Sequence, residues 1–208
     1  EPNLDSIKSD PKPMRDQKPI NKKDYHLITD QNEIDKWIKE AEEVGEVAID
    51  TETSSLDPHQ ADLIGVSLSS KVGKACYIPI GHNSKKCINK DVVLNKLKPL
   101  LEDSSIKKIG QNIKFDFIVL FKHGITISSI EDTMLMSYVL DAGKNRHNMD
   151  TLSEIHLDHK TITFKELVGS GKKEITFGEV DIDKAKDYAA EDADITLRLY
   201  KKFLKSLK

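Results

Sequence analysis

The chain has 208 residues, of which 38% are hydrophobic and 32% are charged, and its formal net charge at pH 7 is −3. This length supports one substantial core and is short for two independent domains. The two cysteines, Cys76 and Cys87, have no CxxC or histidine-spaced partner, which argues against a disulfide framework and against a zinc site. The charge balance also excludes nucleic-acid binding by overall attraction, so a polyanion would be held by local lysines or by bound cations.

Residues 1–22 contain four prolines among lysines, aspartates and serines. Such a composition buries too little apolar surface to order itself, so we predict a disordered or linker segment at 1–22 and one folded domain at 23–208. No apolar run approaches the roughly 20 residues of a membrane span, and the N-terminus is polar. We therefore expect no membrane association and a cytoplasmic protein.

From Tyr25 onward, the hydrophobic pattern predicts alternating helices and strands. Strands are expected at 46–51, 63–69, 75–80 and 106–110. Helices are expected at 30–45, 91–102, 112–122, 131–140, 150–156 and 181–207, with Asn112 as an N-cap. Short joins between the first strands favour an antiparallel meander, and the overall order predicts an α/β domain whose mixed sheet is flanked by helices.

Two carboxylates, Asp50 and Glu52, end the most apolar strand, in VAIDTET at 47–53. Residues two apart in a strand share a face, so both side chains point to one spot while Thr51 takes the other face. Adjacent carboxylates repel each other and lose hydration near a core, unless a multivalent cation lies between them. The alternative is that the strand stops at Asp50 and that both acids are solvated turn residues.

Asp192 lies on a stripe of otherwise apolar or aromatic residues at helical spacing, formed by Tyr188, Asp192, Ile195, Leu199 and Phe203. A lone carboxylate on a packed face needs a partner, and the stripe holds no lysine or arginine. The alternative is an acid at the edge of a wide apolar face. Glu191 and Asp194 fall on other faces and are predicted to be solvated.

Asp116 sits in GQNIKFDFIVLF at 110–121, a segment that is apolar nearly all round and therefore predicted to be central. Placement of an acid in the first helical turn also has a simple explanation in the helix dipole. Buried acids in this number are, however, hard to explain one by one. Oxygen ligands of this kind suit Mg²⁺ or Mn²⁺.

Three ordered motifs now define a resemblance: VAIDTETSSLD, GQNIKFD and YAAEDADIT, with RHNMDTL and HKTITFKELVG between the last two. Together they resemble the 3′→5′ proofreading exonuclease domain of bacterial DNA polymerase I, in the tyrosine-bearing branch of the four-acid exonuclease superfamily. The resemblance covers residues 23–208 and implies a ribonuclease H-like fold, which agrees with the predicted mixed sheet.

The resemblance implies a pair of divalent ions, Mg²⁺ or Mn²⁺. Asp50 would bridge both ions, Glu52 and Asp192 would complete the first site, and Asp116 would support the second. Tyr188 would orient the attacking water, because a phenol with an ordinary pKa near 10 is protonated at neutral pH and is a poor base. The product would be a nucleoside 5′-monophosphate.

The resemblance also implies substrate contacts, which fall on Thr53, Leu56, Gln111, Asn112, Phe115 and Phe164. Leu56 and Phe164 would wedge or stack bases, which selects single-stranded or frayed DNA 3′ ends. Phe115 stands where many relatives carry tyrosine, so a phenolic contact is missing. The alternatives are a core aromatic for Phe164 and a helix cap for Gln111 and Asn112.

Several charged residues have simpler interpretations. Lysines 160, 165, 172 and 173 form either a basic rim along the strand path or a solvated face. His156 and His159 in HLDH are predicted to be surface residues, and His147 with Asp150 to be structural residues at the edge of the site.

The leading hypothesis is a DNA proofreading exonuclease with a polymerase domain in the same parent chain. The chain itself has no room for a polymerase, so it is expected to be a fragment or a free-standing exonuclease, and a monomer. Two alternatives remain: a 3′→5′ exoribonuclease of the same superfamily, and a catalytically silent scaffold that packs against a polymerase.

Overall fold

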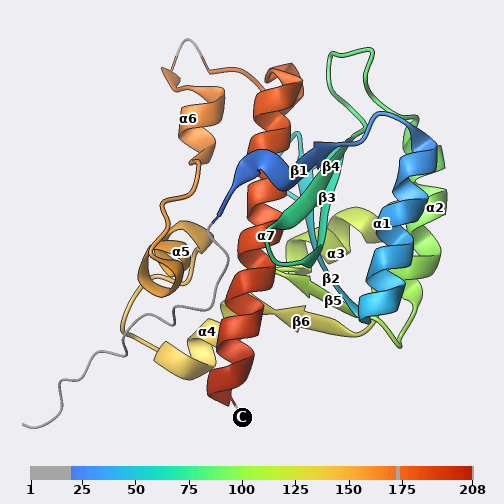
Figure 1. Cartoon of the computed structure of the whole chain (residues 1–208). Coiled ribbons are helices and arrows are strands. Elements are labelled where there is room, and N and C mark those ends of the chain that lie inside the picture. The colour runs from blue at the N-terminus through green and yellow to red at the C-terminus, as the bar shows by residue number, and fades with distance from the viewer. Residues whose placement is uncertain (1–19, 172–173, 208) are drawn as a thin grey trace, which may run out of the picture.

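The computed structural model describes residues 20–171 and 174–207 as a central sheet with helices on both faces (Figure 1). The strands are β1 (Tyr25–Leu27), β2 (Glu46–Thr53), β3 (Leu63–Lys71), β4 (Lys74–Pro79), β5 (Lys107–Gly110) and β6 (Ile130–Asp132). The α-helices are α1 (Gln31–Val44), α2 (Lys90–Glu102), α3 (Lys114–Phe121), α4 (Thr133–Asp141), α5 (Met149–Leu157), α6 (Phe164–Val168) and α7 (Ile182–Leu207). Short 3₁₀ helices are η1 (Lys22–Asp24) and η3 (Phe177–Glu179).

The strands form one mixed sheet in the order β1-β4-β3-β2-β5-β6. Strands β2, β3 and β4 make the antiparallel meander, while the β1–β4, β2–β5 and β5–β6 pairs are parallel. This arrangement confirms the predicted α/β class with a mixed sheet flanked by helices.

Strand β2 divides its side chains between two cores. Val47 and Ile49 pack into the cluster that joins the sheet to α1, α2 and α3, whereas Ala48 packs into the cluster with α7. Helix α7 runs across one face of the sheet, with α1 and α2 on the other (Figure 1). Because side chains alternate along a strand, Asp50 and Glu52 share the α7 face with Ala48, and Thr51 faces the α3 side.

Two predicted helix starts are wrong, and both errors involve Asp132. The predicted helix 131–140 begins instead at Thr133, because Ile130–Asp132 pairs with β5 and the Asp132 carboxylate caps α4 by accepting from the Met134 N–H. Asn112 is not an N-cap: its φ is 58°, and its N–H donates to Asp132 Oδ1 at 3.0 Å. The following helix therefore starts at Lys114 without a side-chain cap.

Two acids of α7 correct the prediction that they are solvated. Asp194 is fully buried and accepts from the Tyr25 hydroxyl at 2.8 Å, the Gly73 N–H at 2.7 Å and Arg198 Nε at 3.0 Å. Glu191 is also buried and binds the 159–162 segment to the helix through the Ile162 N–H at 2.7 Å. Both carboxylates are structural anchors satisfied by donors from other elements.

The predicted linker at 1–22 lies outside the described residues up to position 19. The fold begins before the predicted boundary of 23, because Ile20 packs against the α7 core cluster and η1 starts at Lys22. Among residues 20–171 and 174–207, no helix combines the length and apolar character needed to cross a bilayer.

Candidate active site

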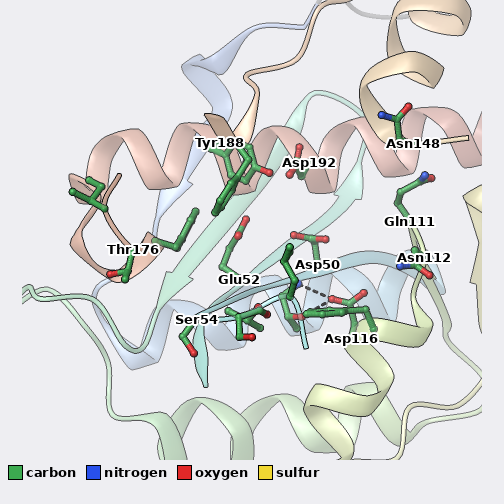
Figure 2. A pocket seen from close by; sticks show the side chains of 18 of the residues that line it. Asp50, Glu52, Ser54, Gln111, Asn112, Asp116, Asn148, Thr176, Tyr188 and Asp192 are labelled. Carbon is green, nitrogen blue, oxygen red and sulfur yellow. Dashed lines mark hydrogen bonds between the residues drawn. The ribbon is translucent and has the colours of Figure 1, made fainter. Parts of the chain in front are cut away.

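A cleft of about 950 Å³ opens where the α7 face of β2 meets the N-terminal end of α3 (Figure 2). Every site residue predicted from the sequence lines it: Asp50, Glu52, Thr53, Leu56, Gln111, Asn112, Phe115, Asp116, Phe164, Tyr188 and Asp192. Segments far apart in the chain therefore converge on one surface. Their individual roles stay predictions.

Three of the four predicted acids form a tight cluster. Asp50, Glu52 and Asp192 each offer a carboxylate oxygen within 4.8 Å of the others. Asp50 and Glu52 come from the same face of β2, and α7 brings Asp192 over them (Figure 2). Glu52 and Asp192 are buried and Asp50 is half-buried. Two alternatives are therefore wrong: that Asp50 and Glu52 are solvated turn residues, and that Asp192 lies at the edge of a wide apolar face.

The carboxylates of this cluster are unfavourable in their charged form, because they are close to one another and shielded from solvent. Burial raises the pKa of Asp50 well above its ordinary value, and the nearby charges of Asp116, Glu52 and Asp192 raise it further. Burial and Asp192 raise the pKa of Glu52 in the same way. The pKa of Asp192 is raised by burial and then by the adjacent Glu191. These carboxylates therefore favour protonation unless positive charge is supplied.

Asp116 approaches from the opposite side of the sheet, on α3. It is 3% exposed, and its Oδ1 accepts from both the N–H and the hydroxyl of Thr51, at 2.8 and 2.5 Å. Burial raises the pKa of Asp116 to about 7, although the two bonds from Thr51 act to lower it. Its charge also raises the pKa of Asp50, so the carboxylates from both faces are electrostatically linked.

Tyr188 lies one helical turn before Asp192 and reaches the same cleft (Figure 2). Burial and the charge of Asp192 raise the pKa of its phenol well above 10, and a hydrogen bond to Asp192 raises it further. The side chain is therefore a phenol at neutral pH and acts as a donor. Its ring packs against Phe164 and Phe177, with centroids 6.3 and 6.0 Å away.

The apolar residues predicted to contact bases are open to solvent. Leu56 is 94% exposed and Phe164 is 45% exposed, so the alternative of a core aromatic for Phe164 is wrong. The Phe164 ring stacks parallel to that of the buried Phe177, at 6.4 Å with an interplanar angle of 6°. Phe164 therefore presents a supported aromatic face at the cleft.

Gln111 and Asn112 are fixed by neighbouring elements. The Gln111 amide nitrogen donates to the His147 carbonyl at 2.8 Å, and its oxygen accepts from the Thr133 hydroxyl at 2.6 Å. Asn112 is held in the left-handed region by Asp132, as described above. Both residues line the cleft, and the helix-cap alternative does not hold for Asn112.

The histidine interpretations are partly wrong. His159 is not a simple surface residue, since its Nε2 lies 3.1 Å from the buried Glu191 carboxylate. His156 is half-buried and packs edge-on against Phe203 at 4.9 Å. His147 is buried and hydrogen-bonds to the Ser137 hydroxyl at 2.7 Å, in keeping with a structural role. Lys160 and Lys165 are exposed, and Lys172 and Lys173 lie outside the described residues.

Several lining residues were not predicted: Ser54, Ser55, Asn148, Glu174, Ile175, Thr176, Phe177 and Glu179. One signal was available, because Thr176 and Glu179 have the spacing of a capping box, which the structure forms. That box orders η3 and so places Phe177 beneath Phe164. The cleft position of the remaining residues depends on tertiary packing.

The acid cluster fits divalent metal ions. Its ligand atoms are carboxylate oxygens, which Mg²⁺ and Mn²⁺ favour. Glu52 Oε1 is buried and has no hydrogen-bond partner among the described residues. A buried, unsatisfied acceptor beside other raised-pKa acids is costly unless a cation binds there.

Comparison with known proteins agrees with this geometry. A family model described as 3′–5′ exonuclease matches residues 25–208. DNA polymerase I of Rhizobium leguminosarum is 44% identical over 203 residues, and DNA polymerase I of Pseudomonas aeruginosa is 45% identical over 183 residues. These matches cover 88% and 85% of the chain but 20% of each relative, so the chain spans about a fifth of their length.

Solved structures show the same architecture. Brucella melitensis NrnC matches with a TM-score of 0.62 and 30% identity, over 80% of this chain and 75% of that chain. The structure of NrnC with bound Mg²⁺ matches with a TM-score of 0.59 and 28% identity, over the same fractions of the two chains. The fold, the acidic cleft and the sequence relatives lead to one conclusion. The chain belongs to the 3′–5′ exonuclease family and is homologous to the 3′–5′ exonuclease domain of DNA polymerase I.

Proposed function

We propose that this domain removes nucleotides from the 3′ end of DNA with the help of a pair of divalent ions, and proofreads for a polymerase in its parent chain. The observation that carries the proposal is the convergence of Asp50, Glu52 and Asp192, whose ligand oxygens lie within 4.8 Å of one another in an open cleft. Divalent cations, which phosphodiester hydrolysis uses, would relieve their mutual repulsion.

Asp50, Glu52 and Asp192 would hold the first ion, and Asp50 with Asp116 would hold the second. When bound, such ions activate water and stabilise the leaving 3′ oxygen. They also supply the local positive charge that a protein with a net charge of −3 lacks at its phosphate site. Either Mg²⁺ or Mn²⁺ suits this set of ligands.

Tyr188 would orient the attacking water without accepting its proton. Its side chain is half-buried beside Asp192, and its raised pKa keeps the proton on the oxygen. A hydroxyl in this state both donates and accepts hydrogen bonds, which fixes the direction of a water molecule. The Phe164 and Phe177 rings hold the phenol in place.

The open rim would bind the last nucleotides of a single strand. Exposed Leu56 and Phe164 offer apolar contact to bases of any sequence, since every base has a π-face. Thr53, Gln111 and Asn112 would supply polar contacts to sugar and phosphate. Phe115 offers a ring without a hydroxyl, so it would pack against the terminal nucleotide without hydrogen-bonding to it.

The size of the relatives supports a polymerase domain in the same parent chain. The chain matches a fifth of each DNA polymerase I, which leaves room in such a parent for a polymerase domain. A catalytically silent scaffold is disfavoured because every acid predicted to bind a metal ion is present and lines the cleft.

The test is degradation of 5′-labelled single-stranded DNA, matched duplex and duplex with a mismatched 3′ end, with Mg²⁺, with Mn²⁺ and with EDTA. We expect metal-dependent shortening from the 3′ end that is faster for single-stranded and mismatched ends. Asp50→Ala and Asp192→Ala should abolish it, and Asp183→Ala, which removes an exposed carboxylate from α7, should not.

Equal activity in Asp50→Ala, Asp192→Ala and the unmodified chain would show that the cleft is not the active site. An RNA of the same sequence tests the substrate class, and a preference for RNA would replace DNA with RNA in the proposal. Coupling to polymerisation is tested by the misincorporation rate of the parent protein with and without Asp50→Ala.

A further inference from the structure

Thr51 lies between the two carboxylates of β2 but takes part in neither the predicted metal set nor the predicted substrate set. Its side chain points to the face opposite Asp50 and Glu52, toward α3. There its N–H and its hydroxyl both donate to Asp116 Oδ1, at 2.8 and 2.5 Å (dashed lines in Figure 2). Thr51 therefore links the part of the site on the α7 face to the acid that arrives from the α3 face.

The backbone bond has a topological cause. Parallel strand β5 pairs with β2 only at Glu46, Val47 and Ala48, and the chain then leaves the sheet to form α3. Asp116 of α3 supplies the acceptor that the Thr51 N–H needs beyond the end of that pairing. The hydroxyl bond is additional, since any residue other than proline could provide the N–H.

We propose that the Thr51 hydroxyl is a positioning group for Asp116, which it holds through Oδ1 so that the carboxylate keeps a fixed orientation at the cleft. This inference rests on the proposed function, in which Asp116 supports the second ion. A carboxylate with one oxygen held by two donors from the strand that carries Asp50 has a fixed distance and orientation relative to that strand.

Thr51→Val is the informative variant because it keeps the shape and the backbone N–H but replaces the hydroxyl with a methyl group. A methyl carbon approaches an oxygen to about 3.3 Å, so the 2.5 Å contact must lengthen by about 0.8 Å. A displacement of that size in a group that orients the reaction lowers kcat by about ten- to a hundredfold. Thr51→Ser keeps the hydroxyl and should retain most of the activity.

A matched control is available in Thr196→Val. Thr196 is buried, as Thr51 is, and its hydroxyl has no hydrogen-bond partner among the described residues. Replacing it with valine therefore tests the generic effect of a buried threonine-to-valine change. We expect exonuclease activity equal to that of the unmodified chain.

The decisive experiment is a double-mutant cycle of Thr51→Val and Asp116→Ala, read by kcat on single-stranded DNA and by calorimetric Mn²⁺ binding without DNA. If Thr51 acts through Asp116, the single variant Thr51→Val should bind Mn²⁺ more weakly than the unmodified chain does. Added to Asp116→Ala, the same substitution should cause no further loss of Mn²⁺ binding or kcat. Circular dichroism and the unfolding midpoint verify that each variant is folded.

Three outcomes would overturn the inference: full activity and Mn²⁺ binding in Thr51→Val, equal damage in Thr51→Ser and Thr51→Val, or additive effects in the Asp116→Ala background. Each of these leaves the proposed function standing if Asp50→Ala remains inactive. Activity in Asp50→Ala would instead refute the proposed function itself, so the two failures are distinguishable.

Discussion

Replacing Asp116 with asparagine should stabilise the metal-free protein, and increasingly so as the pH rises. Asp116 is 3% exposed, and burial raises the pKa of its carboxyl from 3.8 to about 7. Ionising this carboxyl in the folded protein therefore costs about 4 kcal/mol more than ionising it in the unfolded chain, since each pKa unit corresponds to about 1.4 kcal/mol. Asparagine has no such cost, and its amide oxygen can still accept both bonds from Thr51.

The pH dependence follows from proton binding. Between about pH 4 and about pH 7, the folded protein keeps the Asp116 proton while the unfolded chain has lost it. The contribution of Asp116 to the free energy of unfolding therefore falls as the pH rises through this window, and it is constant above it. From about pH 5 to about pH 8, the advantage of Asp116→Asn should grow by about 2 to 3 kcal/mol.

The assay is urea unfolding in EDTA at several pH values, followed by circular dichroism. Comparing the variant with the unmodified chain cancels the contributions of His82, His123 and His156, whose pKa values are lowered by burial. Asp183→Asn, at an exposed position on α7, is the matched control and should show no pH-dependent gain. Saturating Mg²⁺ should shrink the advantage because it binds the folded carboxylates. A difference in unfolding free energy that does not change with pH would refute the reasoning.

Three further predictions follow from packing. Gly65→Ala should lower the free energy of unfolding, measured in urea, by about 1 to 3 kcal/mol, since the added carbon would lie 2.2 Å from the Tyr77 hydroxyl. It should also lower activity, because Gly65 pairs with Glu52 in the sheet. Leu56→Ala and Phe164→Ala should raise KM for single-stranded DNA with little change in melting temperature, because both side chains are exposed at the cleft. Asp194→Ala should destabilise the protein by about 3 to 5 kcal/mol, equally with and without Mg²⁺, because it removes the buried carboxylate that accepts from the Tyr25 hydroxyl, the Gly73 N–H and Arg198 Nε.

The alternation rule for strands placed Asp50 and Glu52 correctly on one face. It succeeded because β2 is buried on both sides, so a one-residue slip would have moved Val47 and Ile49 out of their core. The helical stripe likewise placed Asp192 on the packed face of α7. These are local, periodic signals, and they depend little on how distant segments pack.

The same stripe misplaced Glu191 and Asp194, because α7 is covered on more than one side. Strands β1 and β4 and the 159–162 segment pack around it and supply donors to faces that a single stripe would leave in water. Strands β1 and β6 were missed for a related reason. Each has only three residues, and its pairing with a distant strand, not its local pattern, makes it a strand.

The buried acids of this protein differ in how many hydrogen-bond donors they receive. Asp194 receives a hydroxyl, a backbone N–H and a guanidinium nitrogen, and Glu191 receives a backbone N–H and the His159 imidazole. Glu52 instead has a buried oxygen with no donor among the described residues, and its pKa is raised by burial and by other acids. Folding alone gains nothing from such a carboxylate. Its cost is offset only when a ligand brings positive charge, and this supports the proposal that Glu52 is a metal ligand.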